Sequence, residues 1–286
     1  MTRSIDLSIC VLSFNTKDLL YRCIHSIRKY TTGISYEMIV FDNASQDGSA
    51  IMVEREFPEA ILIHNLTNRW YSGGNNDLLR RAKGRIIVFC NADTYLVDNA
   101  LLQLVQWLDR HPKIVAIEPR QVGDDGHIES TGSFLNHPLT DVIELTMFNR
   151  WLSRLPLIDR FRQRKEDRKR NWKTEMVCGA FFVIRTEAVR SIGGFDERLK
   201  LYYTDTDLCR KLQNIGQIWH IGQVSVKHSL SQSTNQLSWW TRSGIYARDA
   251  LVYYWNTGRK VGGIALWLLL QINRILVQIK HIRDRA

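Results

Sequence analysis

Short apolar runs alternate with amphipathic stretches along the first part of the chain. The apolar runs predict strands over residues 7–13, 37–41, 60–64, 85–90 and 114–118. Between them, apolar residues recur every three or four positions, which predicts helices, each close to a capping or turn residue such as Thr16, Gly84 or Pro112. This strand–helix alternation is typical of a parallel, doubly wound α/β sheet, in which ligands bind at the carboxyl ends of the strands.

The second part of the chain has a different pattern. We expect strands over 177–185, 217–221 and 224–228, short helices over 186–192 and 207–215, and helical structure rich in Trp and Tyr from residue 237 onward. The fold class predicted for the whole chain is therefore α/β with a helical C-terminal extension.

Charge and cysteine content narrow the function classes. The 286 residues carry 39 Lys and Arg against 29 Asp and Glu, a net charge of +10, which favours an anionic partner. No nucleic-acid-binding motif accompanies this charge, so we expect no nucleic-acid partner. The five cysteines form no CxxC pair, and no signal peptide is recognisable, which together favour a cytoplasmic protein with reduced thiols.

Two polar turns follow predicted strands of the first half. Asp42-Asn43 ends the second strand, where a carboxylate can accept hydrogen bonds from a nucleobase or ribose; an ordinary Asx-turn is the alternative. Asn91-Ala92-Asp93 ends the fourth strand, where an aspartate beside a ligand crevice suits a divalent cation held together with substrate phosphates. Helix capping is the alternative for Asp93, but Asp98 and Asn99 already supply it.

Further candidates lie later in the chain. Asp205 and Asp207 stand at the predicted start of a helix after Tyr202-Tyr203; helix capping explains one carboxylate, and the other suits a general base. An isolated histidine such as His228 is usually structural, unless it faces Asp93.

The stretch 68–76 contains two adjacent glycines before a predicted helix, which permit close approach of the backbone to a ligand. Neither GxGxxG after the first strand nor GxxxxGK[ST] is present.

The order of these motifs resembles that of the family 2 glycosyltransferases with the GT-A fold, and most closely the bacterial rhamnosyltransferase-like branch that builds cell-surface polysaccharides. The resemblance covers about residues 5–235. It implies a glycosyltransferase domain over 1–235, with a nucleotide-binding half (1–120) and an acceptor-side half (121–235), followed by a helical, membrane-interfacial region over 236–286.

The resemblance also implies roles for individual residues. Asp205 is the expected catalytic base, and Asp93 with His228 is expected to hold Mg²⁺ or Mn²⁺. The remaining expected contacts fall into a donor group and an acceptor group. The donor group is Ser13, Asn15, Asp42, Asn43, Asn68, Gly73, Gly74, Asn75 and Asn91; the acceptor group is Gly179, Ala180, Tyr202, Tyr203 and Asp207. Two positions depart from the family pattern: Asn91 replaces the first Asp of the metal motif, and Thr204 replaces a Glu.

The expected activity is inverting transfer of a sugar from dTDP-rhamnose or a UDP-sugar to a polysaccharide or lipid-linked saccharide. We considered two alternative functions. A catalytically inactive carbohydrate- or lipid-binding module stays open because of Asn91 and Thr204. A nucleotidyltransferase is disfavoured, because it would carry a glycine-rich loop after the first strand.

The basic stretch 150–173 and the apolar, basic C-terminus favour contact with an anionic membrane surface, on the inner face of the cytoplasmic membrane. A solvated face, or a helix packed on the core or on a second subunit, is the alternative. The uncharged stretch Val261 to Asn273 is shorter than the about 20 residues needed to span a bilayer.

Overall fold

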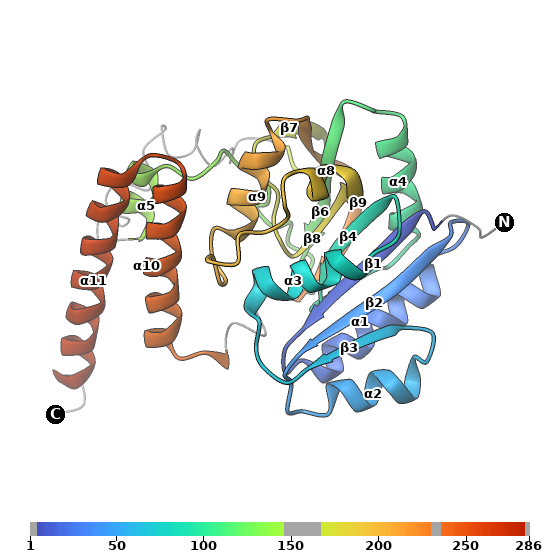
Figure 1. The fold of residues 1–286 in the computed structure, drawn as a ribbon, viewed down its shortest axis with the longest axis horizontal. Helices are drawn as coiled ribbons and strands as arrows, with labels where there is room; N and C mark the ends of the chain where they lie inside the picture. The colour runs from blue at the N-terminus through green and yellow to red at the C-terminus, as the bar shows by residue number, and fades with distance from the viewer. Residues whose placement is uncertain (1–4, 146–166, 230–235, 284–286) are drawn as a thin grey trace.

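The computed structural model describes residues 5–145, 167–229 and 236–283 (Figure 1). The strands are β1 (Leu7–Ser13), β2 (Tyr36–Asn43), β3 (Ile61–Asn65), β4 (Ile86–Asn91), β5 (Thr94–Tyr95), β6 (Ile114–Val122), β7 (Asn171–Thr174), β8 (Phe181–Arg185) and β9 (Gln217–His228). The helices are α1 (Lys17–Tyr30), α2 (Ser49–Glu56), α3 (Trp70–Arg81), α4 (Ala100–Asp109), α5 (Pro138–Leu145), α8 (Thr186–Ser191), α9 (Thr204–Leu212), α10 (Trp239–Asn256) and α11 (Lys260–Arg283).

The strands form one mixed sheet in the order β3-β2-β1-β4-β8-β6-β9-β5, with β7 paired to β9. The four strands β3, β2, β1 and β4 are mutually parallel, as the sequence predicted. Their carboxyl ends therefore lie at one edge, so that Ser13 is in register with Asp42, and Leu12 with Asn91. The predicted α/β fold class is confirmed.

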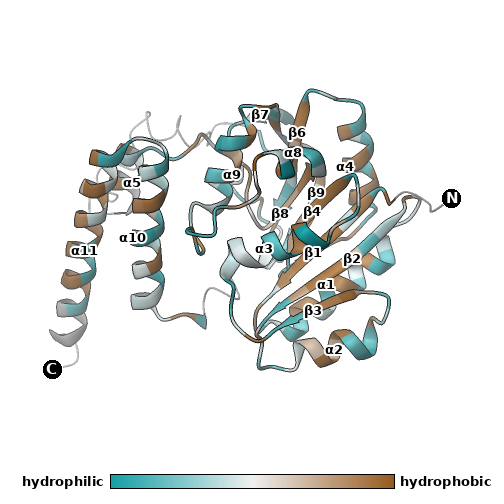
Figure 2. Cartoon of the chain, in the orientation of Figure 1, coloured by the Kyte–Doolittle hydropathy of each residue, from teal (hydrophilic) through white to brown (hydrophobic). Residues whose placement is uncertain are grey.

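Helices cover both faces of the sheet. Alternate residues of β1 enter different cores: Ile9 and Val11 pack with α1, α2 and α4, whereas Cys10 packs with α3, α8 and α9. Figure 2 shows hydrophobic residues along the central strands β1 and β4. Burial on both faces explains why these strands are continuous apolar runs in the sequence.

Three differences from the predicted elements bear on the site. The predicted strand over 177–185 is shorter, because β8 begins at Phe181 and runs antiparallel between β4 and β6. The two predicted strands 217–221 and 224–228 form one strand, β9, whose pairing with β6 shifts register after Pro119.

The third difference concerns the glycines, which lie inside α3 rather than in a loop before it. A Cβ atom on Gly74 would lie 2.6 Å from Leu12 Cδ1, so the glycine allows α3 to pack closely on β1. Gly74 thus serves helix–sheet packing, a role that the sequence pattern did not distinguish from approach to a ligand.

The C-terminal helices stand beside the sheet rather than on it (Figure 1). Helices α10 and α11 pack against each other around Ala250, Tyr254 and Leu266, together with Leu199 and Tyr203 from the loop before α9. The outer side of α11 is exposed and apolar, at Val261, Ile264, Leu268, Ile272, Ile275 and Leu276.

Helix α11 continues through Arg274, so the helix is longer than the uncharged stretch noted in the sequence. By length and composition, Lys260–Gln278 is long and apolar enough to cross a membrane, and little of it is buried. The sequence suggested that this segment is too short to span a membrane, and the length of α11 removes that reason. Core helices of soluble proteins can have the same length and composition.

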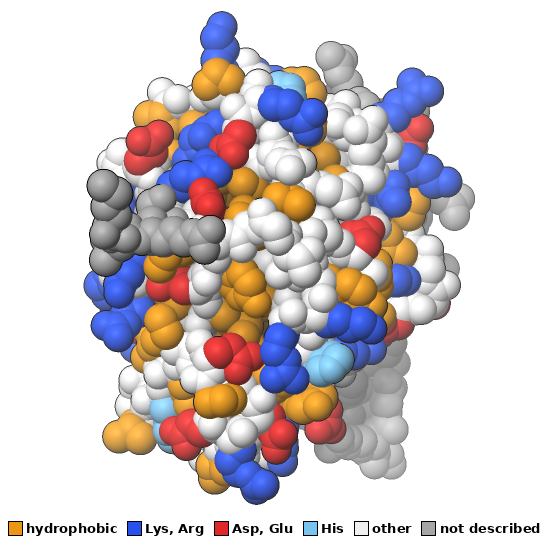
Figure 3. All heavy atoms as spheres, turned by 90° about the vertical axis from the view of Figure 1, so that its right-hand side faces the viewer, with side chains coloured by type: hydrophobic (Ala, Val, Ile, Leu, Met, Phe, Trp, Pro, Cys, Tyr) orange, Lys and Arg blue, Asp and Glu red, His pale blue; other side chains and the backbone are white. Residues whose placement is uncertain are grey.

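Most of the basic stretch 150–173 lies outside the described residues. On the face opposite the C-terminal helices, Lys and Arg side chains are interspersed with Asp and Glu (Figure 3).

Candidate active site

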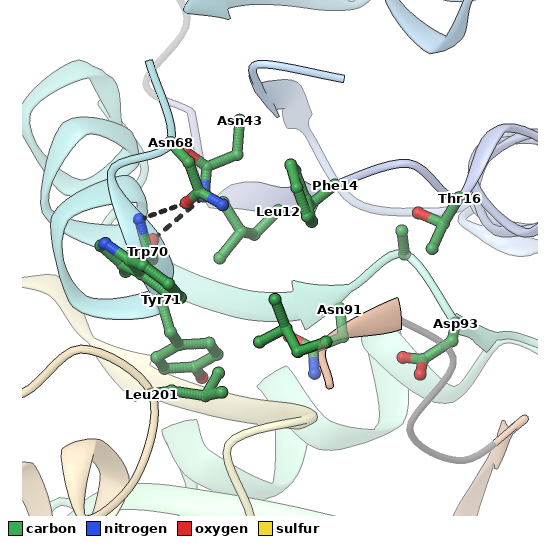
Figure 4. Close-up of a pocket in the computed structure, with 12 residues that line it drawn as sticks. Leu12, Phe14, Thr16, Asn43, Asn68, Trp70, Tyr71, Asn91, Asp93 and Leu201 are labelled. Carbon is green, nitrogen blue, oxygen red and sulfur yellow. Dashed lines mark hydrogen bonds between the residues drawn. The ribbon is translucent and has the colours of Figure 1, made fainter. Parts of the chain in front are cut away.

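A cleft of about 690 Å³, including space open to solvent, lies at the carboxyl ends of β1, β2 and β4 (Figure 4). It is lined by Leu12, Phe14, Thr16, Asn43, Asn68, Trp70, Tyr71, Asn91, Ala92, Asp93, Leu201 and Leu237. Aromatic rings, amides and a single carboxylate thus converge at the edge of the sheet where the parallel architecture predicts ligand binding.

Two predicted donor residues fix the backbone where α3 begins. Asn43 accepts a hydrogen bond from the main-chain N–H of Arg69 (2.6 Å), and its amide donates to the carbonyl of Trp70 (3.2 Å). Asn68 Oδ1 accepts from the main-chain N–H of Trp70 at 2.7 Å. Trp70 has a φ of 59°, a left-handed conformation that is unusual for a bulky residue. The two amides therefore hold the Trp70 ring at the cleft (Figure 4).

Asp42 lies below the cleft surface. Its side chain is fully buried, with His64 Nε2 3.5 Å from Oδ2, and burial raises the pKa of its carboxyl. Ser13 is also buried, and its hydroxyl hydrogen-bonds that of Thr16, which lines the cleft. Asn15 ties the first turn to the second, because its side chain accepts from the N–H of Gln46 at 2.7 Å.

Asp93 and His228 face each other, and only in that case does the sequence predict a functional role for His228. His228 Nε2 lies 3.5 Å from Asp93 Oδ1, and His228 Nδ1 lies 3.0 Å from Glu129 Oε2. Burial opposes protonation of His228, but the two carboxylates outweigh it and raise its pKa to about 9. Among the described residues, Asp93 Oδ1 has no hydrogen-bond partner although Asp93 is only 6% exposed.

An unpartnered buried carboxylate oxygen beside an imidazole nitrogen suits a divalent cation. Within the described part of the chain, no group of three or more His, Cys, Asp or Glu side chains is arranged to hold a metal by itself. The residues therefore fit a cation only if other ligands, such as diphosphate oxygens, complete the coordination.

Asp205 lies in the first turn of α9 and is linked to the cleft by a chain of contacts. The hydroxyl of Tyr71, a cleft residue, donates to the carbonyl of Gly179 at 2.6 Å. The N–H of Gly179 donates to Asp205 Oδ2 at 3.1 Å, and the N–H of Thr206 donates to Oδ1 at 2.9 Å. Burial raises the pKa of Asp205, which outweighs these hydrogen bonds. A partly exposed carboxylate with a raised pKa is a stronger base than an ordinary aspartate, which suits it to accept a proton.

The neighbouring backbone amide is held by a second buried carboxylate. The N–H of Cys178 donates to Glu118 Oε2 at 2.7 Å, and Glu118 Oε1 lies 3.0 Å from His220 Nδ1. Two consecutive amides, those of Cys178 and Gly179, are thus held by Glu118 and Asp205.

The predicted acceptor residues divide into two sets. Tyr203 and Asp207 are interior residues: Tyr203 donates to Asp141, and Asp207 pairs with Arg210 and Lys211. Both side chains are buried and paired within the described structure. Their contact with the acceptor stays a prediction.

The other acceptor-side residues lie nearer to open space. Ala180 is buried, but its carbonyl accepts from the N–H of Asn91 at 2.8 Å, which ties the start of β8 to the cleft. Tyr202 is partly exposed, with its ring 4.7 Å from that of Tyr246.

The loop between α8 and α9 is held by the C-terminal helix α10. Asp249 of α10 is fully buried, and its Oδ2 accepts from the main-chain N–H groups of Lys200, Leu201 and Tyr202, at 3.0, 2.9 and 3.0 Å. Leu201 lines the cleft, so α10 positions part of the cleft wall.

Sequence reasoning missed Glu118, Glu129 and Asp249. Their partners lie 102 residues away for Glu118–His220, 99 for Glu129–His228 and up to 49 for Asp249. The one available signal was an acidic residue within an apolar stretch, as at Glu118 in β6.

Comparison with known structures shows the same fold in glycosyltransferases. A mannosyltransferase from Pyrobaculum calidifontis, in complex with GDP-Man and Mn²⁺, superposes with a TM-score of 0.59 at 18% identity, covering 90% of this chain and 65% of that one. The structure is therefore of the GT-A glycosyltransferase class.

Residues 8–193 match the model of glycosyl transferase family 2, so the chain belongs to this family of glycosyltransferases. An uncharacterized glycosyltransferase of Bacillus subtilis, YfnE, is 34% identical over 89 residues, covering 30% of this chain and 22% of that protein. The O-antigen biosynthesis protein RfbC of Myxococcus xanthus is 25% identical over 221 residues, covering 73% of this chain and 16% of that protein. The chain thus matches only about a fifth of the length of these relatives.

Proposed function

We propose that the protein transfers a sugar from a nucleoside-diphosphate sugar to a saccharide acceptor in polysaccharide synthesis, with inversion and with Asp205 as the general base. The observation that carries the proposal is the continuous connection from the cleft, through Tyr71 and Gly179, to Asp205. This chain of hydrogen bonds links an aspartate with a raised pKa to Tyr71 in the wall of the cleft, and so supports its role as the base.

The donor half of the proposal rests on the cleft itself. The nucleoside lies against Phe14, Asn43, Asn68 and Trp70, which offer rings and amides, and the diphosphate lies toward Asp93. Asp42 would accept hydrogen bonds from the nucleobase or ribose, since neither of its buried carboxylate oxygens has a hydrogen-bond partner among the described residues. The M. xanthus relative supports an O-antigen-like, polysaccharide-related product, and the rhamnosyltransferase-like motif order favours dTDP-rhamnose or a UDP-sugar as donor.

Asp93 and His228 would hold Mg²⁺ or Mn²⁺, with the cation displacing the proton that the raised pKa of His228 favours in its absence. The unpartnered oxygen of Asp93 and the Mn²⁺ complex of the P. calidifontis protein support this proposal. When bound, such an ion neutralises the negative charge that develops on the departing nucleoside diphosphate. Glu129 holds His228 through Nδ1 and so leaves Nε2 facing Asp93. Asn91, in place of the usual aspartate, offers an amide to the donor's sugar or ribose.

Asp205 removes the proton from the acceptor hydroxyl as that oxygen attacks the anomeric carbon. The bond to the diphosphate breaks on the opposite side of the sugar, which inverts its configuration. The N–H groups of Gly179 and Thr206 orient the carboxylate for this step.

We further propose that the enzyme works at the cytoplasmic face of a membrane, on an acceptor linked to a lipid diphosphate. The exposed apolar side of α11 and the net charge of +10 support this placement.

Thermal unfolding with UDP and dTDP, each with and without Mn²⁺, tests the donor and metal together. The expected result is a nucleotide-dependent rise in melting temperature that needs the metal and is lost in Asp93→Ala. Asp205→Asn should keep this rise but lose turnover about 10²–10⁴-fold. The absence of any nucleotide effect in folded protein would refute the proposal and favour the inactive binding module.

A further inference from the structure

A glutamate and a histidine lie side by side in the interior of the sheet, and neither lines the cleft. Glu118 of β6 and His220 of β9 are cross-strand partners, and both residues are 0% exposed. Glu118 Oε1 lies 3.0 Å from His220 Nδ1. Burial of two ionisable groups is costly unless their polar atoms find partners, so the other contacts of this pair decide what it can do.

The partners of the histidine ring define the charge of the pair. His220 Nε2 lies 3.0 Å from the main-chain carbonyl of Arg168, and His220 Nδ1 faces the carboxylate of Glu118. A carbonyl and an ionised carboxylate only accept hydrogen bonds, so both ring nitrogens carry a hydrogen when both contacts are satisfied. Such a ring is an imidazolium, and its positive charge balances the negative charge of Glu118.

The second oxygen of Glu118 reaches the residues that hold the base. Glu118 Oε2 accepts from the N–H of Cys178 at 2.7 Å. The next N–H along the chain, that of Gly179, donates to Asp205 Oδ2 at 3.1 Å. Residues 178–180, called here the base strip, therefore connect the buried pair directly to Asp205.

The base strip is fixed at both ends. At the far end, the carbonyl of Ala180 accepts from the N–H of Asn91, a cleft residue, at 2.8 Å. At the near end, the Glu118 carboxylate fits against Gly132, where a Cβ atom would lie 2.9 Å from Oε1. The amide that contacts the base thus lies between two anchored neighbours.

We propose that Glu118 and His220 are positioning residues of the transferase reaction. His220 orients the Glu118 carboxylate, and Glu118 holds the base strip so that the N–H of Gly179 aligns Asp205 with the acceptor. The inference rests on the proposed function, because it needs Asp205 to be the base. Hydrogen bonds to an ionised acceptor are stronger than neutral ones, and misplacing a reacting group by about 1 Å can lower a rate about 10²-fold.

Three substitutions of Glu118 separate hydrogen bonding from charge and length. Glu118→Gln keeps an acceptor for Cys178 and offers its amide to an uncharged His220, so it should keep catalysis within about threefold of the wild type. Glu118→Met has a similar length without an acceptor, and Glu118→Asp is one methylene shorter. Both should lower catalysis about tenfold or more. The matched control is Glu54→Gln on exposed α2, beside β3 at the other end of the sheet (Figure 1), which should change nothing.

Catalysis is measured as hydrolysis of UDP-glucose and of dTDP-rhamnose with Mn²⁺, in which water replaces the acceptor hydroxyl. The affinity for UDP, measured by calorimetry, should stay unchanged in all Glu118 variants, because the cleft residues are intact. In the Asp205→Asn background, Glu118→Met should cause no further loss, because Glu118 acts only through the base. A merely structural role would lower UDP affinity and hydrolysis together, in both backgrounds.

Nuclear magnetic resonance of the full-length protein gives a readout that needs no turnover. Both ring nitrogens of His220 should carry a hydrogen in the wild type, whereas only Nε2 should do so in Glu118→Gln. Hydrogen exchange of the Cys178 and Gly179 amides should be about tenfold faster or more in Glu118→Met and Glu118→Asp than in the wild type.

Several results would overturn the inference. Wild-type hydrolysis and amide exchange in Glu118→Met and Glu118→Asp would show that the pair does not hold the base strip. A bare ring nitrogen on His220 in the wild type would refute the charged pair. Melting temperatures identify a variant that fails to fold, and Glu118→Asp serves if Glu118→Met does so.

The outcome is separable from that of the donor experiment. A wild type that shows neither nucleotide binding nor hydrolysis would refute the proposed function, and this inference with it. Intact nucleotide effects and Asp205-dependent hydrolysis that ignores all changes at Glu118 would refute the positioning role alone.

Discussion

The three hydrogen bonds to Asp249 offer a direct measure of how strongly α10 holds the loop that leads to the base. In Asp249→Ala, three buried or partly buried N–H groups lose their common acceptor, the carboxylate Oδ2. Each unsatisfied donor costs about 1 kcal/mol at the low end of the usual range, so we expect a loss of about 3 kcal/mol in the free energy of unfolding.

Asp249→Asn separates the acceptor oxygen from the charge. Burial raises the pKa of Asp249 above its unfolded value, so the folded state loses stability as the pH rises through that window and the carboxylate becomes charged. An asparagine keeps an acceptor oxygen without this cost. We therefore expect Asp249→Asn to change the stability at pH 7 by less than about 1 kcal/mol.

Urea unfolding of the three proteins at pH 7, followed by circular dichroism, gives the two differences. Acceptor-dependent turnover should fall more in Asp249→Ala than donor hydrolysis, because Tyr202, which is predicted to lie on the acceptor side, loses its support. If the alanine and asparagine variants unfold at the same urea concentration, the acceptor oxygen is not what holds the loop, and the reasoning is wrong.

Two further substitutions test the base and the glycine pair. Burial raises the pKa of Asp205, so the charged carboxylate lowers the stability of the folded state above that pKa. Asp205→Asn should therefore melt at a higher temperature than the wild type at pH 7, and the difference should shrink toward pH 4. The acid limb of kcat/KM in the wild type should lie above the usual aspartate pKa of about 3.9. An acid limb at or below that value would contradict the assignment of the base. Gly74→Ala should lower the free energy of unfolding by about 1–3 kcal/mol, since the new Cβ would lie 2.6 Å from Leu12 Cδ1. In Gly73→Ala the new Cβ would lie 3.2 Å from Arg69 Cβ, and the better helix propensity of alanine should leave the free energy of unfolding nearly unchanged. Equal urea midpoints for these two variants would show that α3 does not need the close approach.

The parallel half of the fold was predictable because strands that are buried on both faces of the sheet appear in the sequence as continuous apolar runs. Strands β1, β2, β3 and β4 are short apolar runs, and the chain direction fixes where they end. The polar turns after β2 and β4 therefore placed Asn43, Asn91 and Asp93 at one edge before any coordinates were known.

The rest of the fold and site depends on contacts between residues far apart in the sequence, which local sequence patterns do not predict. Strand β8 inserts between β4 and β6, and Glu118 meets His220 across 102 residues. The start of α3 at Trp70 was missed because two glycines usually mark a loop, whereas here both lie inside the helix and Gly74 lets it lie against β1. The contrast between Asp205 and Asp207 also required coordinates, since both stand in the first turn of α9 and only their partners distinguish them.

The position of β8 has a consequence for how the chain is made. Strands β4 and β6 are synthesised well before residues 181–185, which later fill the space between them. Until then, the edge of β4 is an unpaired template open to other chains. A ribosome-bound chain ending before residue 181 should therefore be prone to aggregation, and chaperones would be needed most during the interval between the emergence of β4 and that of β8.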